Sequence, residues 1–233
     1  MRIKPSILWV SVALLLILLL ETTGMDLPVQ DLFFQFDSHQ WRIDKDDPFW
    51  RAIFYTGAKR TVALVAILTL LTLLHSWKFK TRIHLRRKLI LLLVTLIVVP
   101  GTISGLKNIS NVHCPWSLTR YGGDLPHVPF LATNPNDFPA KRPGKCFPAG
   151  HPSGGFAFMS LFFLLPGAWR WVGLGTGITL GWIMGLYQMM KGAHYLSHVI
   201  VSMLLAWLLI EGIVLLFEKY WPERGKTPHT PVT

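Results

Sequence analysis

The sequence predicts an all-α polytopic membrane protein with six transmembrane helices in a bundle. Three observations support this class: 51% of the 233 residues are apolar, only 15% are charged, and the mean hydropathy is +0.41. Such a chain has too little polar surface for a soluble globule. The net charge of +11 does not indicate a nucleic-acid partner, because the basic residues stand beside apolar runs and no nucleic-acid-binding motif accompanies them.

Six apolar runs give the predicted helices, since about 20 apolar residues cross the hydrocarbon of a bilayer. They cover 7–20, 61–77, 89–106, 154–171, 172–190 and 196–217. Arg2 and Lys4 before the first run also resemble the start of a signal peptide. The sequence Glu-Thr-Thr-Gly at 21–24 lacks a small-x-small cleavage site, which favours an uncleaved anchor.

Basic residues predict the orientation of the bundle. They occur before the first run, densely within 78–88, at Arg170 between the fourth and fifth runs, and after 217. With six spans all these positions fall on one side, and the positive-inside rule makes that side cytoplasmic. The segments 22–60, 107–153 and 187–195 then share the opposite side.

Three structural features are expected around this bundle. The segment 22–60 places apolar residues among acids and is interpreted as an interfacial segment that does not span the bilayer. Cys114 and Cys146 share one outward loop, where an oxidising compartment permits a disulfide. Glycines at 173, 177, 181 and 185 form a smooth strip along which another helix can approach closely.

Phosphate chemistry is predicted by histidines and cations near the ends of the apolar runs. His151 precedes the fourth run and His194 precedes the sixth, where free helix N–H groups and the positive dipole end favour an anion. A histidine can protonate a leaving oxygen, and a neutral imidazole can accept a phosphoryl group. Lys107 and Arg120 are candidates to bind phosphate. Taken alone, they also fit a snorkelling lysine and a solvated loop arginine.

The motifs resemble those of the type-2 phosphatidic-acid phosphatase family, within the superfamily that includes vanadium haloperoxidases. The first family motif is Lys, six residues, then Arg-Pro; here Lys107 is followed after six residues by Cys114-Pro115. The second is Pro-Ser-Gly-His; here Pro-Ala-Gly-His occupies 148–151, and Ser153 is the candidate for the missing hydroxyl. The lysine, glycine and histidine match, while the arginine and serine do not.

The third family motif is Ser-Arg, five residues, His, three residues, Asp. Here Tyr-Gln at 187–188 is followed after five residues by His194 and then by His198 in place of the aspartate. A neutral imidazole at His198 can still fix the tautomer of its neighbour, but it brings no negative charge. Lys191 and Arg120 are the proposed replacements for the two missing arginines.

The resemblance implies a membrane-embedded phosphatase. His194 would attack phosphorus, and His151 would protonate the leaving alkoxide and later activate water. Lys107, with backbone amides around Gly150, would neutralise the phosphoryl oxygens. No metal and no cofactor is required by that mechanism.

The whole chain, 1–233, is therefore expected to be a single phosphatase domain, with core motifs at 107–199 and a cytoplasmic tail at 218–233. By the same resemblance it would lie in a bacterial inner (cytoplasmic) membrane, with the site facing the periplasm and both termini cytoplasmic. The expected partners are the bilayer and a lipid phosphate or diphosphate substrate, with no nucleic acid; the sequence selects no particular lipid and no oligomeric state.

Two other classes of function fit the same residues. A catalytically silent lipid-phosphate binder, or a phosphotransferase, would agree with the missing arginines and aspartate. A membrane metal or haem protein would use His194 and His198, four residues apart, with His151 or His113 nearby. That site lacks the general-base glutamate of a zinc hydrolase motif.

Overall fold

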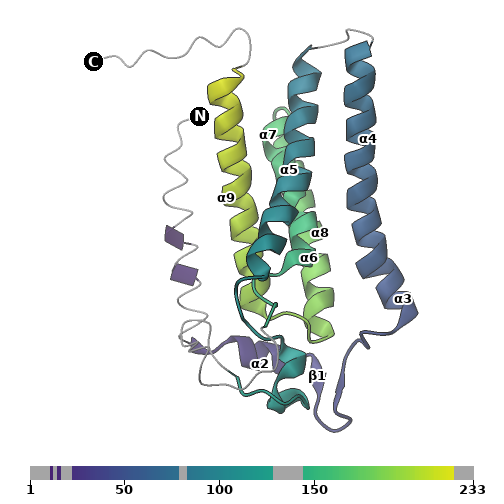
Figure 1. Cartoon of the computed structure of the whole chain (residues 1–233), viewed down its shortest axis with the longest axis vertical. Helices are drawn as coiled ribbons and strands as arrows, with labels where there is room; N and C mark the ends of the chain where they lie inside the picture. Colours follow the sequence, from purple (N-terminus) through teal and green to yellow (C-terminus); the bar gives the residue numbers. More distant parts are fainter. Residues whose placement is uncertain (1–10, 13–14, 17–22, 79–82, 128–143, 223–233) are drawn as a thin grey trace.

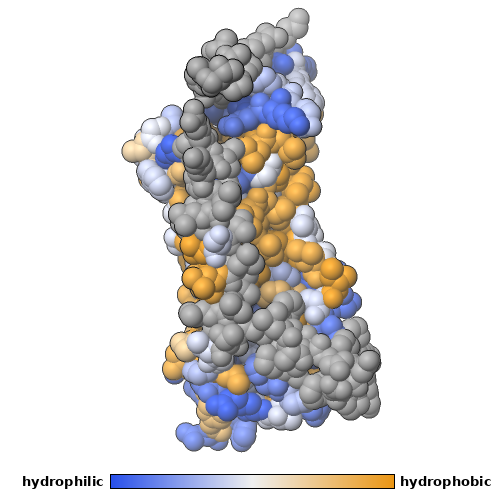
Figure 2. Space-filling view, turned by 90° about the vertical axis from the view of Figure 1, so that its left-hand side faces the viewer, coloured by the Kyte–Doolittle hydropathy of each residue, from blue (hydrophilic) through white to orange (hydrophobic). Residues whose placement is uncertain are grey.

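The computed structural model describes residues 11–12, 15–16, 23–78, 83–127 and 144–222. Within them, three helical stretches are long and apolar enough to cross a membrane: Pro48–Lys78, Leu85–Lys107 and Leu196–Tyr220. They run along the long axis of the molecule (Figure 1). The face in Figure 2 carries hydrophobic groups over its middle and hydrophilic groups toward both ends. This is the distribution of a membrane protein.

Three predicted runs are confirmed as helices that are long and apolar enough to cross a membrane. They are α4 (Ala58–Lys78), α5 (Ile83–Lys107) and α9 (Leu196–Tyr220). The first of them begins earlier than its apolar run, because α3 (Pro48–Trp50) and the π-helix η1 (Arg51–Gly57) lead into α4 without a break. Asp47 starts this stretch: its carboxylate accepts the backbone N–H groups of Phe49 at 2.8 Å and Trp50 at 3.2 Å.

The bundle of six spans is not confirmed. The predicted first run, 7–20, lies largely outside the described residues. The fourth run is not one long helix but α6 (Gly150–Phe156), the 3-10 helix η5 (Ala157–Ser160) and α7 (Leu161–Leu164). It ends early because Pro166 cannot continue a helix and Gly167 has a φ of 54°. Neither this stretch nor α8 (Trp169–Met190) is among the three candidate spans.

The glycine strip of α8 is confirmed as a packing surface. Gly173, Gly177, Gly181 and Gly185 are all buried. A Cβ built on Gly177 would lie 2.2 Å from the backbone nitrogen of Met159, and one on Gly181 would lie 2.1 Å from a ring carbon of Phe156. The missing side chains therefore allow η5 and α6 to pack directly on the α8 backbone.

A small layer of short elements covers the lower end of the bundle in Figure 1. It contains α2 (Asp26–Asp31), the antiparallel strands β1 (Phe34–Gln35) and β2 (Gln40–Trp41), and the 3-10 helices η2 (Pro115–Ser117) and η3 (Thr119–Tyr121). Asp26 accepts the backbone N–H of Ser197 at 2.9 Å, at the start of α9. Buried Gln30 donates to the carbonyl of Met189 at 2.8 Å, at the end of α8. The layer thus fixes the turn between α8 and α9.

Basic side chains gather at the opposite end of the bundle, as predicted. Arg86, Arg87 and Lys88 donate to three carbonyls near helix C-termini: Ser76 of α4, Trp221 after α9 and Leu164 of α7. Carbonyls in a last helical turn have no partner within the helix, and the dipole there favours cations. These three residues therefore tie together the helix ends on one side of the bundle.

Candidate active site

Five segments bring the candidate residues to the lower end of the bundle in Figure 1. They are the C-terminal ends of α5 and α8, the N-terminal ends of α6 and α9, and the junction of η1 with α4. Because α5 and α8 end where α6 and α9 begin, carbonyl-rich and N–H-rich helix ends lie close together.

His194 lies in the turn between α8 and α9. The turn is formed by Gly192, which has a φ of 73° and whose N–H bonds the carbonyl of Met189 at 2.9 Å. The segment 191–194 is not helical, since α8 ends at Met190 and α9 begins at Leu196. Lys191 therefore does not lie one helical turn before His194.

His194 is buried, with 4% of the residue exposed. Burial, followed by the nearby His198 and Lys107, holds its pKa well below the usual value, and His151 acts in the same direction. The main chain of Cys146 opposes this effect. The imidazole is therefore neutral at physiological pH, which is the form that can act as a nucleophile.

His198 lies beside His194, with ring centroids 5.8 Å apart. Its ring packs edge-on against Phe147 at 5.2 Å and Tyr195 at 5.0 Å, and only 3% of the residue is exposed. The Nδ1 atoms of both histidines are buried without a hydrogen-bond partner in the described part of the chain. The structure brings the two imidazoles together, as the motif spacing predicted.

His151 is the second residue of α6 and faces the π-helix η1. Its Nε2 lies 2.8 Å from the carbonyl oxygen of Phe54. A carbonyl only accepts hydrogen bonds, so Nε2 carries the proton of the neutral ring and Nδ1 is its basic nitrogen. Nδ1 is buried and has no partner among the described residues. The ring also stacks on Tyr55, with centroids 4.8 Å apart.

The electrostatic surroundings of His151 are strongly positive. Its pKa is lowered to about 4, chiefly by burial; the hydrogen bond to Phe54 opposes this, and Lys59, Lys191 and Lys107 add to it. Burial also lowers the pKa of Lys191 from its ordinary value. Its ammonium lies 4.8 Å from the ring centroid of Tyr187. The structure therefore places the predicted cations Lys107 and Lys191 close enough to act on His151.

Gly150 and Ser153 belong to the first turn of α6. The Ser153 hydroxyl donates to the carbonyl of Gly150 at 2.5 Å and is fully buried. Its hydrogen is thus used within the turn, and binding of phosphate by either residue stays a prediction. Gly150 packs against Ser104, since a Cβ there would lie 3.1 Å from the serine Oγ.

Arg120 lies in the outer layer and pairs with Asp31 of α2. Its Nε and Nη2 donate to the two carboxylate oxygens at 2.8 and 2.6 Å. The hydrogen bond from Arg120 lowers the pKa of Asp31, and Tyr121 adds a third bond to the same carboxylate at 2.9 Å. The guanidinium is therefore committed to joining η3 to α2. A role for Arg120 in phosphate binding stays a prediction.

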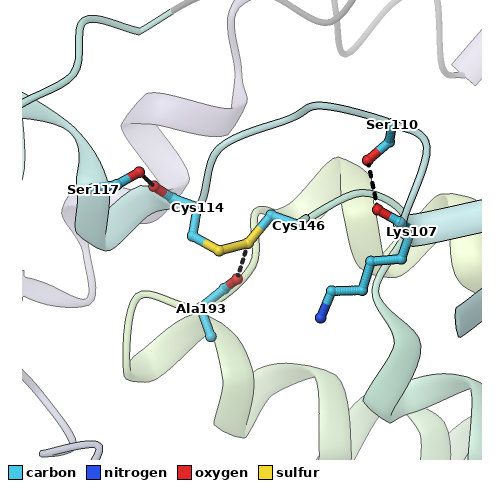
Figure 3. Close-up of a disulfide and its surroundings, with 6 residues drawn as sticks. All are labelled: Lys107, Ser110, Cys114, Ser117, Cys146 and Ala193. Carbon is cyan, nitrogen blue, oxygen red and sulfur yellow. Dashed lines mark hydrogen bonds between the residues drawn. A yellow bond between two sulfur atoms is a disulfide. The ribbon is translucent and has the colours of Figure 1, made fainter. Parts of the chain in front are cut away.

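The disulfide between Cys114 and Cys146 is confirmed, with Cα atoms 5.2 Å apart. It lies directly against the α8–α9 turn, because Sγ of Cys146 is 3.1 Å from the carbonyl oxygen of Ala193 (Figure 3). A disulfide sulfur has no proton, so this is a close contact. In the same view the Lys107 side chain extends away from Ser110, on the side of the loop where Ala193 lies.

Sequence reasoning missed three contributions from η1 and the start of α4: the carbonyl of Phe54, the ring of Tyr55 and the ammonium of Lys59. The available signal was the spacing of Tyr55 and Lys59, four residues apart, which places them on one helix face. It was missed because the charges of Lys59 and Arg60 ended the apolar run, so the helix was expected to begin at 61.

Metal ligation finds less support in this geometry. In the ranges that the structure describes, no group of three or more His, Cys, Asp or Glu residues is arranged to hold a metal ion. The pair His194 and His198 contacts aromatic rings and main chain.

Buried imidazoles and lysines therefore gather at one end of the helices that could cross a membrane. In a comparison with known families, the model of the PAP2 superfamily matches residues 88–222, more than half of the chain. The protein belongs to the PAP2 superfamily. Membership supports phosphoric ester hydrolase activity and association with a membrane. Neither the curated proteins nor the solved structures contain a significant match.

Proposed function

We propose that this protein hydrolyses a lipid phosphate or diphosphate ester through a phosphohistidine formed on His194. The observation that carries the proposal is the setting of this residue: a buried, neutral imidazole close to His151 and Lys107. A neutral imidazole is a competent phosphoryl acceptor, and covalent catalysis divides hydrolysis into two easier displacements.

In the first displacement, a ring nitrogen of His194 attacks phosphorus while the bond from phosphorus to the leaving oxygen breaks. The leaving alkoxide or phosphate takes the proton of His151. In the second, a water molecule gives its proton to His151 and attacks phosphorus, and the bond to His194 breaks to release phosphate. His151 would act through Nδ1, because Nε2 is hydrogen-bonded to Phe54.

The low pKa of His151 suits the second step, in which it must accept a proton. For the first step the bound phosphate provides the compensation: its negative charge opposes Lys107 and Lys191 and favours the protonated imidazole. The same lysines neutralise the charge that develops on the phosphoryl oxygens. His198 would orient His194 through the contact between their rings.

The basic residues at the other end of the bundle support the orientation. If Arg86, Arg87 and Lys88 mark the cytoplasmic face, the site faces the periplasm of a bacterial inner membrane. A lipid headgroup at that surface would reach the lower end of the bundle without leaving the bilayer. The chain would then act as one phosphatase domain with both termini in the cytoplasm.

The direct test measures phosphate release by the detergent-purified, oxidised protein from a panel of lipid phosphates and diphosphates with EDTA present. We expect release by the wild type, none by His194→Asn, and an acid-labile phosphoenzyme in the wild type alone. His198→Asp should keep or raise turnover, because it restores a charged orienting group. No release from a folded, oxidised protein on any substrate would overturn the proposal.

Three alternative functions would give different results. A silent lipid-phosphate binder, which the absent family arginines favour, would bind the lipids without turnover. A phosphotransferase would form the phosphoenzyme and pass the group to a second lipid instead of water. A metal protein would carry stoichiometric metal that EDTA removes, whereas a haem protein would keep its iron in the presence of EDTA.

A further inference from the structure

Three lysines from different parts of the chain act electrostatically on His151. Lys59 comes from α4, Lys107 ends α5, and Lys191 follows α8. All three lower the pKa of His151, and Lys59 has the largest effect of the three. Within the ranges that the structure describes, none of them forms an ion pair with a carboxylate. Asp46 acts electrostatically on Lys191 without forming an ion pair, so the group of lysines keeps a net positive charge, which is costly unless an anion occupies it.

Tyr55 joins two of these lysines to the histidine. The Lys59 ammonium donates to the Tyr55 hydroxyl at 2.9 Å and lies 4.1 Å from the centroid of its ring. The Lys191 ammonium lies 4.9 Å from the same ring, and the ring stacks on His151 at 4.8 Å. Cation–π attraction holds both ammonium groups against the phenol while leaving their remaining N–H donors free.

The π-helix η1 gives this arrangement its geometry. One stretch of seven residues, Arg51–Gly57, presents the carbonyl of Phe54 to Nε2 of His151 and the ring of Tyr55 to the face of the same imidazole. Wide helical turns of this type recur at functional sites. The segment lies before residues 88–222, which match the PAP2 superfamily model.

We propose that Lys59, held in place by Tyr55, binds the phosphate group of the substrate and supplies a cation that the motif region lacks. The side chain is exposed, so its ammonium can turn from the phenol to a phosphoryl oxygen. The inference rests on the proposed function, because the anion is taken to be the phosphate that His194 attacks. The recognised chemistry is a multiply charged phosphate, whether on a lipid headgroup or free.

The test compares Lys59→Met, Lys59→Arg and the matched control Arg60→Met, which removes an exposed charge from the next position. The first measurement is the affinity for orthovanadate and for inorganic phosphate by titration calorimetry. Loss of one charge-assisted hydrogen bond predicts binding weaker by about tenfold or more for Lys59→Met. Lys59→Arg should restore most of the affinity, and Arg60→Met should stay within about twofold of wild type.

The second measurement is the pH profile. Removing the Lys59 charge should raise the pKa of His151, and protonation of His151 favours the bound anion. The strengthening of inorganic-phosphate binding at acidic pH should therefore begin at higher pH in Lys59→Met but not in Arg60→Met. A merely structural role would lower stability without this shift. Tyr55→Phe keeps the ring and should give an intermediate loss of affinity. Equal affinities and unshifted profiles in both Met variants would overturn the inference.

The two proposals fail in different ways. If the wild type binds vanadate through Lys59 but hydrolyses nothing, the phosphatase proposal fails and the anion site stands. If it hydrolyses lipid phosphates and Lys59→Met retains wild-type vanadate affinity, only the role of Lys59 is refuted. A short-chain soluble phosphate ester and a long-chain lipid phosphate show which part of the substrate Lys59 contacts. An equal rise in the KM of Lys59→Met for both substrates places the contact on the phosphate itself.

Discussion

Removing the disulfide should disable the site while the helices stay folded. Cys114 and Cys146 are separated by 32 positions, and in the chain-entropy model a closed loop of that size stabilises the native state by about 3 to 4 kcal/mol. Without the bridge, this stabilisation is lost from the loop whose Cys146 contacts Ala193, the residue before His194. We therefore expect the double variant Cys114→Ala/Cys146→Ala to lose most of its turnover and to unfold at a lower temperature.

The assay pairs activity with two structural measurements on the same sample. Far-UV circular dichroism should be unchanged at 25 °C, because the helices α4, α5 and α9 do not depend on the bridge. Thermal unfolding should show the lower midpoint, and wild-type protein treated with a reductant should behave like the double variant. Full turnover by a fully reduced or doubly substituted protein would refute the idea that the bridge positions His194.

Three further predictions follow from the described contacts. His151 has an ordinary pKa of 6.5 and a folded value of about 4, so its neutral form favours folding above pH 6.5. That contribution, about 3 kcal/mol, should be lost as pH falls from 6.5 towards 4, and the fall in unfolding midpoint should be smaller in His151→Asn. Arg120→Ala breaks an exposed pair with Asp31 and should cost about 1 kcal/mol in chemical denaturation; a large loss of phosphate affinity would instead show that Arg120 reaches the substrate. Gly177→Ala should cost roughly 1 to 3 kcal/mol by forcing α8 away from η5, whereas Gly175→Ala, which meets nothing within 4 Å, should be neutral or stabilising; equal effects would contradict the packing argument.

The sequence was sufficient where a property depends on local pattern. Apolar length identified α4, α5 and α9, and the four-residue spacing of glycines identified the packed face of α8. The pairing of Cys114 with Cys146 followed from their shared loop. His151, His194 and His198 were found because each stands at or near a helix terminus, where imidazoles in an apolar sequence are conspicuous.

The remaining features depend on contacts between distant parts of the chain. The Arg120–Asp31 pair joins residues 89 positions apart, and no local pattern distinguishes that guanidinium from a phosphate ligand. The fourth apolar run is hydrophobic enough to suggest a span, but Pro166 and Gly167 within it end the helix at Leu164. Hydropathy alone also could not show that the helical stretch begins before residue 61 and brings Tyr55 and Lys59 to the site.

The three cations that tie the helix ends together complicate any experiment on membrane topology. Arg86, Arg87 and Lys88 each donate to a carbonyl near the end of a different helix, so neutralising them removes both an insertion signal and three inter-helix bonds. A flipped or degraded product would then have two explanations. Replacing each arginine by lysine and the lysine by arginine keeps the charge and tests the contribution of the hydrogen bonds. Moving the charges a few residues along the connection tests the contribution of the insertion signal.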